Sequence, residues 1–158
     1  MRMMLRETLF LQTFSFFKIP LIFFLQPALL ELTDDRTVMR IKLRHRSRNH
    51  LNSMYFGALC IGADCAGGLL AMKLIRERGG KYSMVFKDIK GEFLKRVEGD
   101  AHFICNDGAV VRELMDRAEK SGQRENASVN IDIVVPSKGD EVAAKFALTL
   151  SIKKKSAY

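Results

Sequence analysis

Residues 54–75 form the stretch that most restricts the fold of this chain. They read MYFGALCIGADCAGGLLAMKLI and contain one acid, Asp64, and one base, Lys73. A helix with no polar face has to be buried nearly all round. The stretch also carries four glycines, and each glycine inside a helix costs about 1 kcal/mol relative to alanine. We therefore expect a long central helix that other backbone approaches closely.

The rest of the chain supplies strands that could wrap this helix. In residues 36–44, Met39, Ile41 and Leu43 alternate with basic residues, which is the period of a half-buried strand. Strands joined by short turns form antiparallel sheets. An antiparallel sheet curved round one helix is the α+β hotdog fold. The expected helices are 2–17, 18–26, 54–75 and 107–121, and the expected strands are 28–33, 36–44, 82–95, 100–106, 127–135 and 141–153.

Length and composition favour a single domain. The 158 residues are 47% apolar, which suits one hotdog domain over 1–158, with an N-terminal helical extension at 1–26 and a core at 27–153. Cys60, Cys65 and Cys105 form no C-x-x-C pair, so we expect three reduced, buried thiols and a cytoplasmic location. No spaced Cys/His cluster is present, so neither a metal nor a cofactor is expected.

Local features can be predicted at the helix ends. Asn52 or Ser53 is a candidate N-cap for the central helix. Asp107 could cap the start of the 107–121 helix, and Gly122 could end it. Residues 136–140 (PSKGD) have the composition of a turn between two strands.

Basic residues exceed acidic ones by 26 to 18, which gives a net charge of +8. Such an excess favours anionic partners, although a solvated strand face explains it equally well. No signature of a nucleic-acid-binding fold accompanies it, so nucleic acid is not an expected partner. Part of the excess follows one predicted strand and loop: Arg36, Arg40, Lys42, Arg44, Arg46 and Arg48.

Two apolar segments superficially resemble membrane spans. In residues 54–72, Asp64 lies near the centre, where a carboxylate would cost about 2.5–3.5 kcal/mol in a bilayer. Residues 9–30 are rich in Phe and Leu but are interrupted by Lys18, Pro20, Gln26 and Pro27. We expect no integral membrane segment and no signal peptide. A peripheral membrane contact by the N-terminal segment stays open.

Residues 49–64 resemble the hotdog thioesterase superfamily, in particular its phenylacetyl-CoA-type branch. That branch has an Asn, then His-Gly-Gly at the start of the central helix, then an Asp nine residues after the His. Here Asn49 is followed by Tyr55-Phe56-Gly57 and by Asp64. The longer run from KIPLIFFLQPALLEL to RSRNHLNSMYFGA is similar to uncharacterised bacterial thioesterase-like proteins, and the resemblance covers about residues 18–153. It implies hydrolysis of acyl-CoA or acyl-carrier-protein thioesters.

The chain departs from that pattern at two places. Tyr55 replaces the His and Phe56 replaces the first Gly, while the strand near 86–87 lacks the Ser or Thr of some relatives. These losses leave an alternative open, namely a catalytically inactive protein that binds acyl ligands. A dehydratase on this fold would need a His, and His50 is the only one nearby in sequence. A binder of anionic surfaces through the arginine-rich strand is a further alternative.

Thioester hydrolysis needs a base or nucleophile and a donor to the oxyanion. Asp64 suits the first role, since burial in an apolar helix should raise its pKa. The Gly57 N–H suits the second, because it lies in the first helical turn. Tyr55 could instead be a buried aromatic, and Asn49 a loop residue. The predicted substrate-binding residues are Asn49, Tyr55, Phe56, Arg48 and Arg96, the arginines facing CoA phosphates.

The spacing of the two catalytic candidates favours a dimer. Gly57 and Asp64 are seven residues apart, or roughly 10 Å along a helix. Both groups must lie near 3 Å from one reacting centre. Two antiparallel copies could achieve this, with Gly57 from one and Asp64 from the other. We therefore expect a homodimer with two equivalent sites, and further assembly into a tetramer stays open.

Overall fold

The computed structural model describes residues 3–155, so the ends of the predicted domain, at 1–2 and 156–158, lie outside the described part. Each predicted helix and strand is present, with boundaries shifted by a few residues. The helices are α1 (Leu5–Lys18), α2 (Pro20–Leu25), α3 (Phe56–Glu77) and α4 (Gly108–Ser121). The strands are β1 (Ala28–Leu32), β2 (Thr37–Ile41), β3 (Tyr82–Phe93), β4 (Ala101–Cys105), β5 (Glu125–Val134) and β6 (Val142–Lys154).

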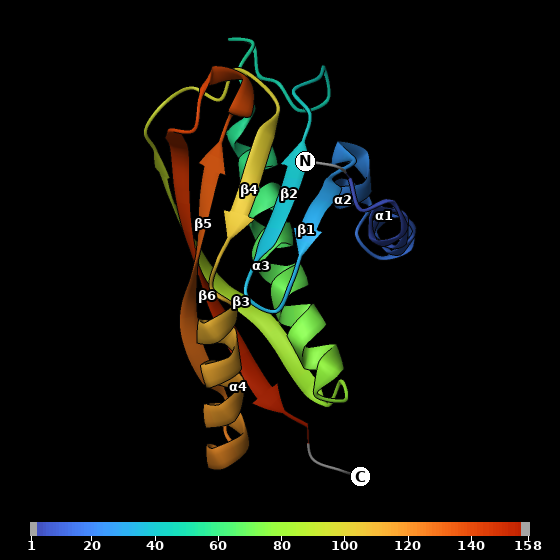
Figure 1. Ribbon diagram of the computed structural model, residues 1–158, viewed down its shortest axis with the longest axis vertical. Helices are drawn as coiled ribbons and strands as arrows, with labels where there is room; N and C mark the ends of the chain where they lie inside the picture. Colours follow the sequence, from blue (N-terminus) through green and yellow to red (C-terminus); the bar gives the residue numbers. More distant parts are fainter. Residues whose placement is uncertain (1–2, 156–158) are drawn as a thin grey trace.

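The strands form one antiparallel sheet in the order β1-β2-β4-β5-β6-β3. Helix α3 runs behind the sheet, and α1 and α2 lie beside β1 at one edge (Figure 1). Strand β3, which directly follows α3 in the chain, forms the opposite edge. A curved antiparallel sheet packed on a long central helix is the hotdog fold, as predicted.

Helix α3 is buried over most of its surface but keeps one open stripe. It contacts β2, β3, β4, β5, β6 and α4. Along another side, Cys60, Ile61 and Asp64 stay partly open to solvent. The prediction of burial nearly all round therefore holds for most of α3 but fails along this stripe, which no described element fully covers. By length and composition α3 could cross a membrane, but 61% of its apolar window is buried in the protein, as in a core helix.

A close contact explains one of the helix glycines. A Cβ at Gly62 would lie 2.2 Å from the Phe103 ring of β4, which is fully buried. A Cβ at Gly68 would meet nothing closer than 3.7 Å. The approach at Gly62 is therefore made by an aromatic side chain, whereas the sequence predicted backbone. Glycine at 62 lets the helix lie flat against the inner face of the sheet.

The predicted helix ends are partly correct. Gly122 ends α4 with a φ of +64°, as expected. Asp107 occupies the N-cap of α4, but its carboxylate accepts bonds from the Asn130 backbone N–H (2.6 Å) and side-chain amide instead of capping the helix. Helix α3 begins after Tyr55, so the Asn52 or Ser53 cap was wrong. The predicted 136–140 turn contains a short 3-10 helix, η1 (Pro136–Lys138).

Exchange of glycine for alanine should have opposite effects at two positions of α3. Gly62→Ala is expected to lower the free energy of unfolding by about 1–3 kcal/mol, because Phe103 must move. Gly68→Ala is the matched control, with room for a methyl group, and should raise stability by up to about 1 kcal/mol through helix propensity. Urea unfolding measures both. Equal effects of the two substitutions would show that the contact with Phe103 does not fix the helix.

Candidate active site

Backbone hydrogen bonds to two other segments hold the start of α3 in place. The Met54 N–H donates to the Val97 carbonyl and the Tyr55 N–H donates to the Ser47 carbonyl, both at 2.8 Å. The loop before them is held by Asn49, whose side-chain oxygen accepts bonds from the N–H groups of Leu51 (2.9 Å) and Ser53 (3.2 Å). Asn49 therefore has a structural task in its own chain, and contact with substrate stays a prediction.

The first turn of α3 offers free donors. The first bond to the Tyr55 carbonyl comes from the Ala58 N–H at 2.9 Å, and in residues 3–155 the Gly57 N–H has no backbone acceptor. A Cβ at Gly57 would lie 2.5 Å from the Tyr55 ring, so glycine allows the ring to cover this turn. Tyr55 is 49% exposed and Phe56 is 57% exposed. The interpretation of Tyr55 as a buried aromatic is therefore wrong.

A cavity of about 550 Å³ opens beside this turn, and we call it the helix-start cavity. Four of the predicted substrate-binding residues line it, namely Asn49, Tyr55, Phe56 and Arg96. Arg48 does not line it, although the backbone of Arg48 pairs with that of Met54. The remaining lining residues are His50, Ser53, Met54, Leu59, Phe93, Leu94, Lys95 and Val97.

Asp64 lines a separate cavity of about 350 Å³, the Asp64 cavity. Burial raises the pKa of the Asp64 carboxyl, which is the direction that the sequence predicted. In the described part of the chain burial is the one cause, and no cation beside Asp64 lowers its pKa. The other lining residues are Cys60, Ile61, Phe86, Lys87, Asp88, Ile89 and Leu148.

An irregularity in β3 shapes the Asp64 cavity. The register with β6 shifts between Phe86 and Ile89, so Lys87 and Asp88 bulge at the cavity wall. Asp88 accepts a bond of 2.8 Å from the Thr149 hydroxyl of β6. Sequence reasoning missed Lys87 and Asp88 as lining residues, because no residue pattern marks the bulge. It also missed Lys95 at the helix-start cavity.

Cys60 lies one helical turn before Asp64 and lines the same cavity. Burial raises the pKa of its thiol, so the thiolate that a nucleophile needs is disfavoured. Cys65 and Cys105 are buried, and burial also raises the pKa of their thiols, that of Cys105 to about 11. All three thiols are free, as expected, but Cys60 is only half-buried, so the prediction of burial was wrong there.

The candidate site is therefore divided within one chain. The helix-start cavity and the Asp64 cavity have no lining residue in common. Both border the edge strand β3, the first at Phe93 and the second at Phe86 and Ile89. Within the described chain no lining residue joins the two cavities.

Comparisons with known proteins agree with this fold. The family model described as "Domain of unknown function (DUF4442)" matches residues 7–152. A protein of unknown function from Pseudomonas aeruginosa, named a probable thioesterase, superposes with a TM-score of 0.77 at 21% identity, over 93% of this chain and 95% of that one. A protein of unknown function from Chlorobaculum tepidum gives 0.78 at 17% identity, over 97% and 98%. A thioesterase of Haemophilus influenzae gives 0.69 at 15%, over 94% and 91%. No curated protein matches the chain.

The raised pKa of Asp64 predicts a stability effect that depends on pH. The pKa of Asp64 in the folded protein lies above the unfolded value of about 3.9. The ionised carboxylate therefore destabilises the fold at pH values above both pKa values. Asp64→Asn should therefore unfold at higher urea than the unchanged protein at pH 7. The advantage should shrink as the pH falls and vanish below about pH 4. A variant that is less stable at pH 7 would show that the Asp64 carboxylate is stabilised by a charged partner.

Proposed function

Because this chain belongs to the DUF4442 family and shares its fold with proteins named as thioesterases, we propose that it hydrolyses acyl thioesters of coenzyme A or of acyl carrier protein. The observation that carries the proposal is Asp64, a carboxylate with a raised pKa that faces a cavity from the apolar part of α3. A raised pKa makes this carboxylate a stronger proton acceptor than an exposed one.

The exposed edge of β3 supports a homodimer. Ile89 (45% exposed), Phe93 and Leu94 are apolar and open to solvent at this edge. A long unpaired strand edge presents free N–H and C=O groups to which another chain can pair. Antiparallel pairing of β3 with β3 of a second copy would extend the sheet across a two-fold axis. It would also cover the open stripe of α3.

This pairing would bring the two cavities together. An axis near Lys90 and Gly91 would place Asp88 of one copy opposite Phe93 of the other. The Asp64 cavity of the first copy would then adjoin the helix-start cavity of the second. The roughly 10 Å that separates Gly57 and Asp64 along one helix no longer matters, because each site takes one group from each copy.

The proposed reaction proceeds by water attack. Asp64 accepts a proton from water as the water oxygen bonds to the thioester carbonyl carbon, and the carbonyl electron pair moves to its oxygen. The Gly57 N–H of the second copy donates to this oxyanion. Collapse of the intermediate breaks the carbon–sulfur bond, and the thiolate takes the proton from Asp64, leaving a carboxylic acid and a thiol. Phe56 offers apolar surface to the acyl group, and Arg96 with Lys95 offers charge to phosphates or an acidic carrier.

A specific observation favours a second candidate function. The Tyr55 ring covers the turn that carries Gly57, where the resembled branch has a histidine. A ring in that place could hold an acyl ligand without assisting its hydrolysis. On this view the protein binds acyl thioesters and does not turn them over.

Hydrolysis of a panel of acyl-CoA and acyl-carrier-protein thioesters tests the main proposal. Asp64→Asn should lower kcat/KM by at least about a hundredfold, since the general base is lost. Asp140→Asn, an exposed acid in the turn before β6, is the matched control and should keep full activity. If the unchanged protein hydrolyses no thioester, yet acyl-CoA raises its melting temperature, the protein is a binder and the hydrolase proposal fails.

Substitution at the β3 edge tests the dimer. Ile89→Asp should convert a dimer into a folded monomer, because the side chain is half open in the single chain and a charge there opposes pairing. Light scattering after size-exclusion chromatography gives the mass, and circular dichroism confirms folding. Leu9→Asp, at an equally apolar but distant exposed position on α1, should leave the dimer intact. A dimer that survives Ile89→Asp but dissociates with Leu9→Asp would place the interface at α1.

A further inference from the structure

Helix α1 lies against the sheet with its polar side. Thr8 accepts a bond of 3.0 Å from the Leu29 N–H, and Gln12 donates a bond of 2.7 Å to the Pro27 carbonyl. Ser15 and Leu11 are the buried residues of this helix. These contacts use polar side chains to satisfy backbone groups at the β1 edge of the sheet. Apart from Leu11 and the half-buried Phe14, the apolar side chains of α1 consequently point away from the protein.

The outward side of α1 and α2 forms an apolar surface that we call the N-terminal ridge. Its most exposed members are Phe17, at 74%, and Leu5, at 70%. Folded proteins rarely leave an extended apolar patch open unless it binds something. The ridge comprises Leu5, Leu9, Phe10, Phe16, Phe17, Ile19, Leu21 and Phe24.

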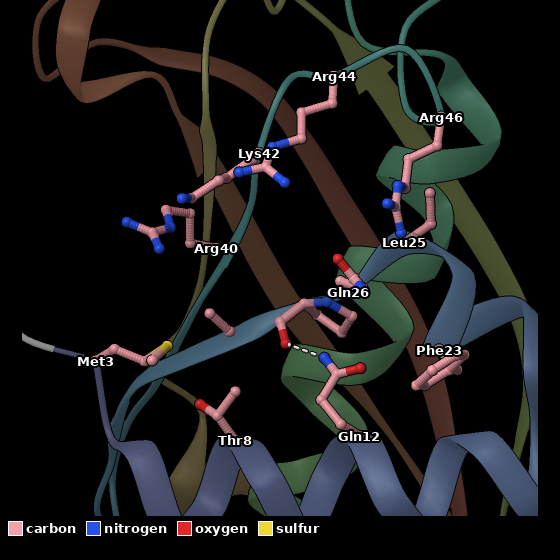
Figure 2. Close-up of a pocket in the computed structure, with 12 residues that line it drawn as sticks. Met3, Thr8, Gln12, Phe23, Leu25, Gln26, Arg40, Lys42, Arg44 and Arg46 are labelled. Carbon is pink, nitrogen blue, oxygen red and sulfur yellow. Dashed lines mark hydrogen bonds between the residues drawn. The ribbon is translucent and has the colours of Figure 1, made fainter.

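A basic cavity of about 430 Å³ borders the ridge on one side. Four basic side chains from β2 and the loop after it line one wall, and Thr8 and Gln12 of α1 lie opposite (Figure 2). In residues 3–155 no acidic side chain forms an ion pair with any of the four. The four are Arg40, Lys42, Arg44 and Arg46.

Two of these arginines are placed so that they could contact an anionic ligand. The Arg40 Nε atom is buried without a hydrogen-bond partner, a state that an anion in the cavity would relieve. Arg46 donates to the Phe24 carbonyl at 2.9 Å and lies over the Phe24 ring. Arg46 therefore joins the charged cavity to the apolar ridge, so that one ligand surface could contact both.

Basic residues also border the ridge on its other side. A cavity of about 470 Å³ between α1 and α3 is lined by Arg6 and Arg76 together with Phe10 and Met72. Glu7, the only acid in the sequence of α1 and α2, lines the same cavity, where three basic side chains outnumber it. The ridge is thus an apolar strip with cations along both sides.

We propose that the N-terminal ridge docks on the surface of an anionic lipid bilayer. Phenylalanine and leucine side chains would enter the boundary between headgroups and acyl chains, and the flanking arginines and lysines would bind lipid phosphates. A second copy fits this surface less well, since two ridges face to face would also bring their unpaired cations together. The ridge lies at the β1 edge and the proposed thioester site at the β3 edge, so a docked protein keeps its site free.

Sedimentation with vesicles of phosphatidylcholine, with and without phosphatidylglycerol, tests this proposal on the full chain. The protein should bind the anionic vesicles at least about tenfold more tightly than the neutral ones, and salt should weaken binding. Phe10→Ser with Phe17→Ser should lower affinity at least about tenfold. Leu51→Ser, at an exposed apolar position outside α1 and α2, is the control and should bind normally.

Charge reversal tests the basic cavity. Lys42→Glu with Arg44→Glu should lower affinity for anionic vesicles at least about tenfold, whereas Lys120→Glu with Lys138→Glu, which makes the same change of net charge on α4 and η1, should not. All substituted side chains are exposed, and circular dichroism checks that each variant folds.

Three results would overturn the proposal. The unchanged protein could fail to bind anionic vesicles, or the ridge variants could bind as well as their controls. In the absence of vesicles, the ridge variants could also have a lower oligomer mass than the unchanged protein, which would make the ridge a contact between copies. Asp64→Asn should bind vesicles normally, so loss of hydrolysis and loss of docking are separate outcomes.

Discussion

The packing of α3 on the sheet determines the rest of the structure. Gly62 lets the helix approach the Phe103 ring closely, so the sheet can curve over one side of the helix. The other side keeps Cys60, Ile61 and Asp64 partly open. A helix without a polar face cannot leave such a stripe in water without cost. In the proposed dimer, the open stripe, the exposed β3 edge and the Asp64 carboxylate would all lie where the two chains meet.

The two edges of the sheet differ in whether another element covers them. At β1 the edge is covered by α1, whose polar side chains bond to the backbone of Leu29 and Pro27. At β3 no element of the described chain covers the edge. The first arrangement turns apolar side chains outward beside unpaired cations, and the second leaves a strand free to pair. One sheet could thus carry a lipid-facing end and a catalytic end without interference between them.

Much of the fold could be predicted from the sequence, because it depends on periodic burial. Alternation in β2, β5 and β6 and the composition of α3 are strong local signals. Asp64 was found because it is a lone acid in an apolar helix. The bulge that brings Lys87 and Asp88 to the cavity was missed, since a one-residue register shift follows from packing. The outward orientation of Phe10 and Phe17 was not predicted either, because an apolar pattern does not say which side meets the protein.

The most direct test of the account is complementation between two inactive variants. Gly57→Pro removes the proposed oxyanion donor in a first helical turn, where the backbone tolerates proline, and the exposed Tyr55 ring has to move aside. Asp64→Asn removes the base. Each variant alone should be inactive on a thioester that the unchanged protein hydrolyses, while retaining its helical circular dichroism. Co-expression of both should restore about a quarter of the activity, because half of the dimers are mixed and each has one intact site. A mixture as inactive as its parents, with mixed dimers shown to form, would contradict a site shared between two chains.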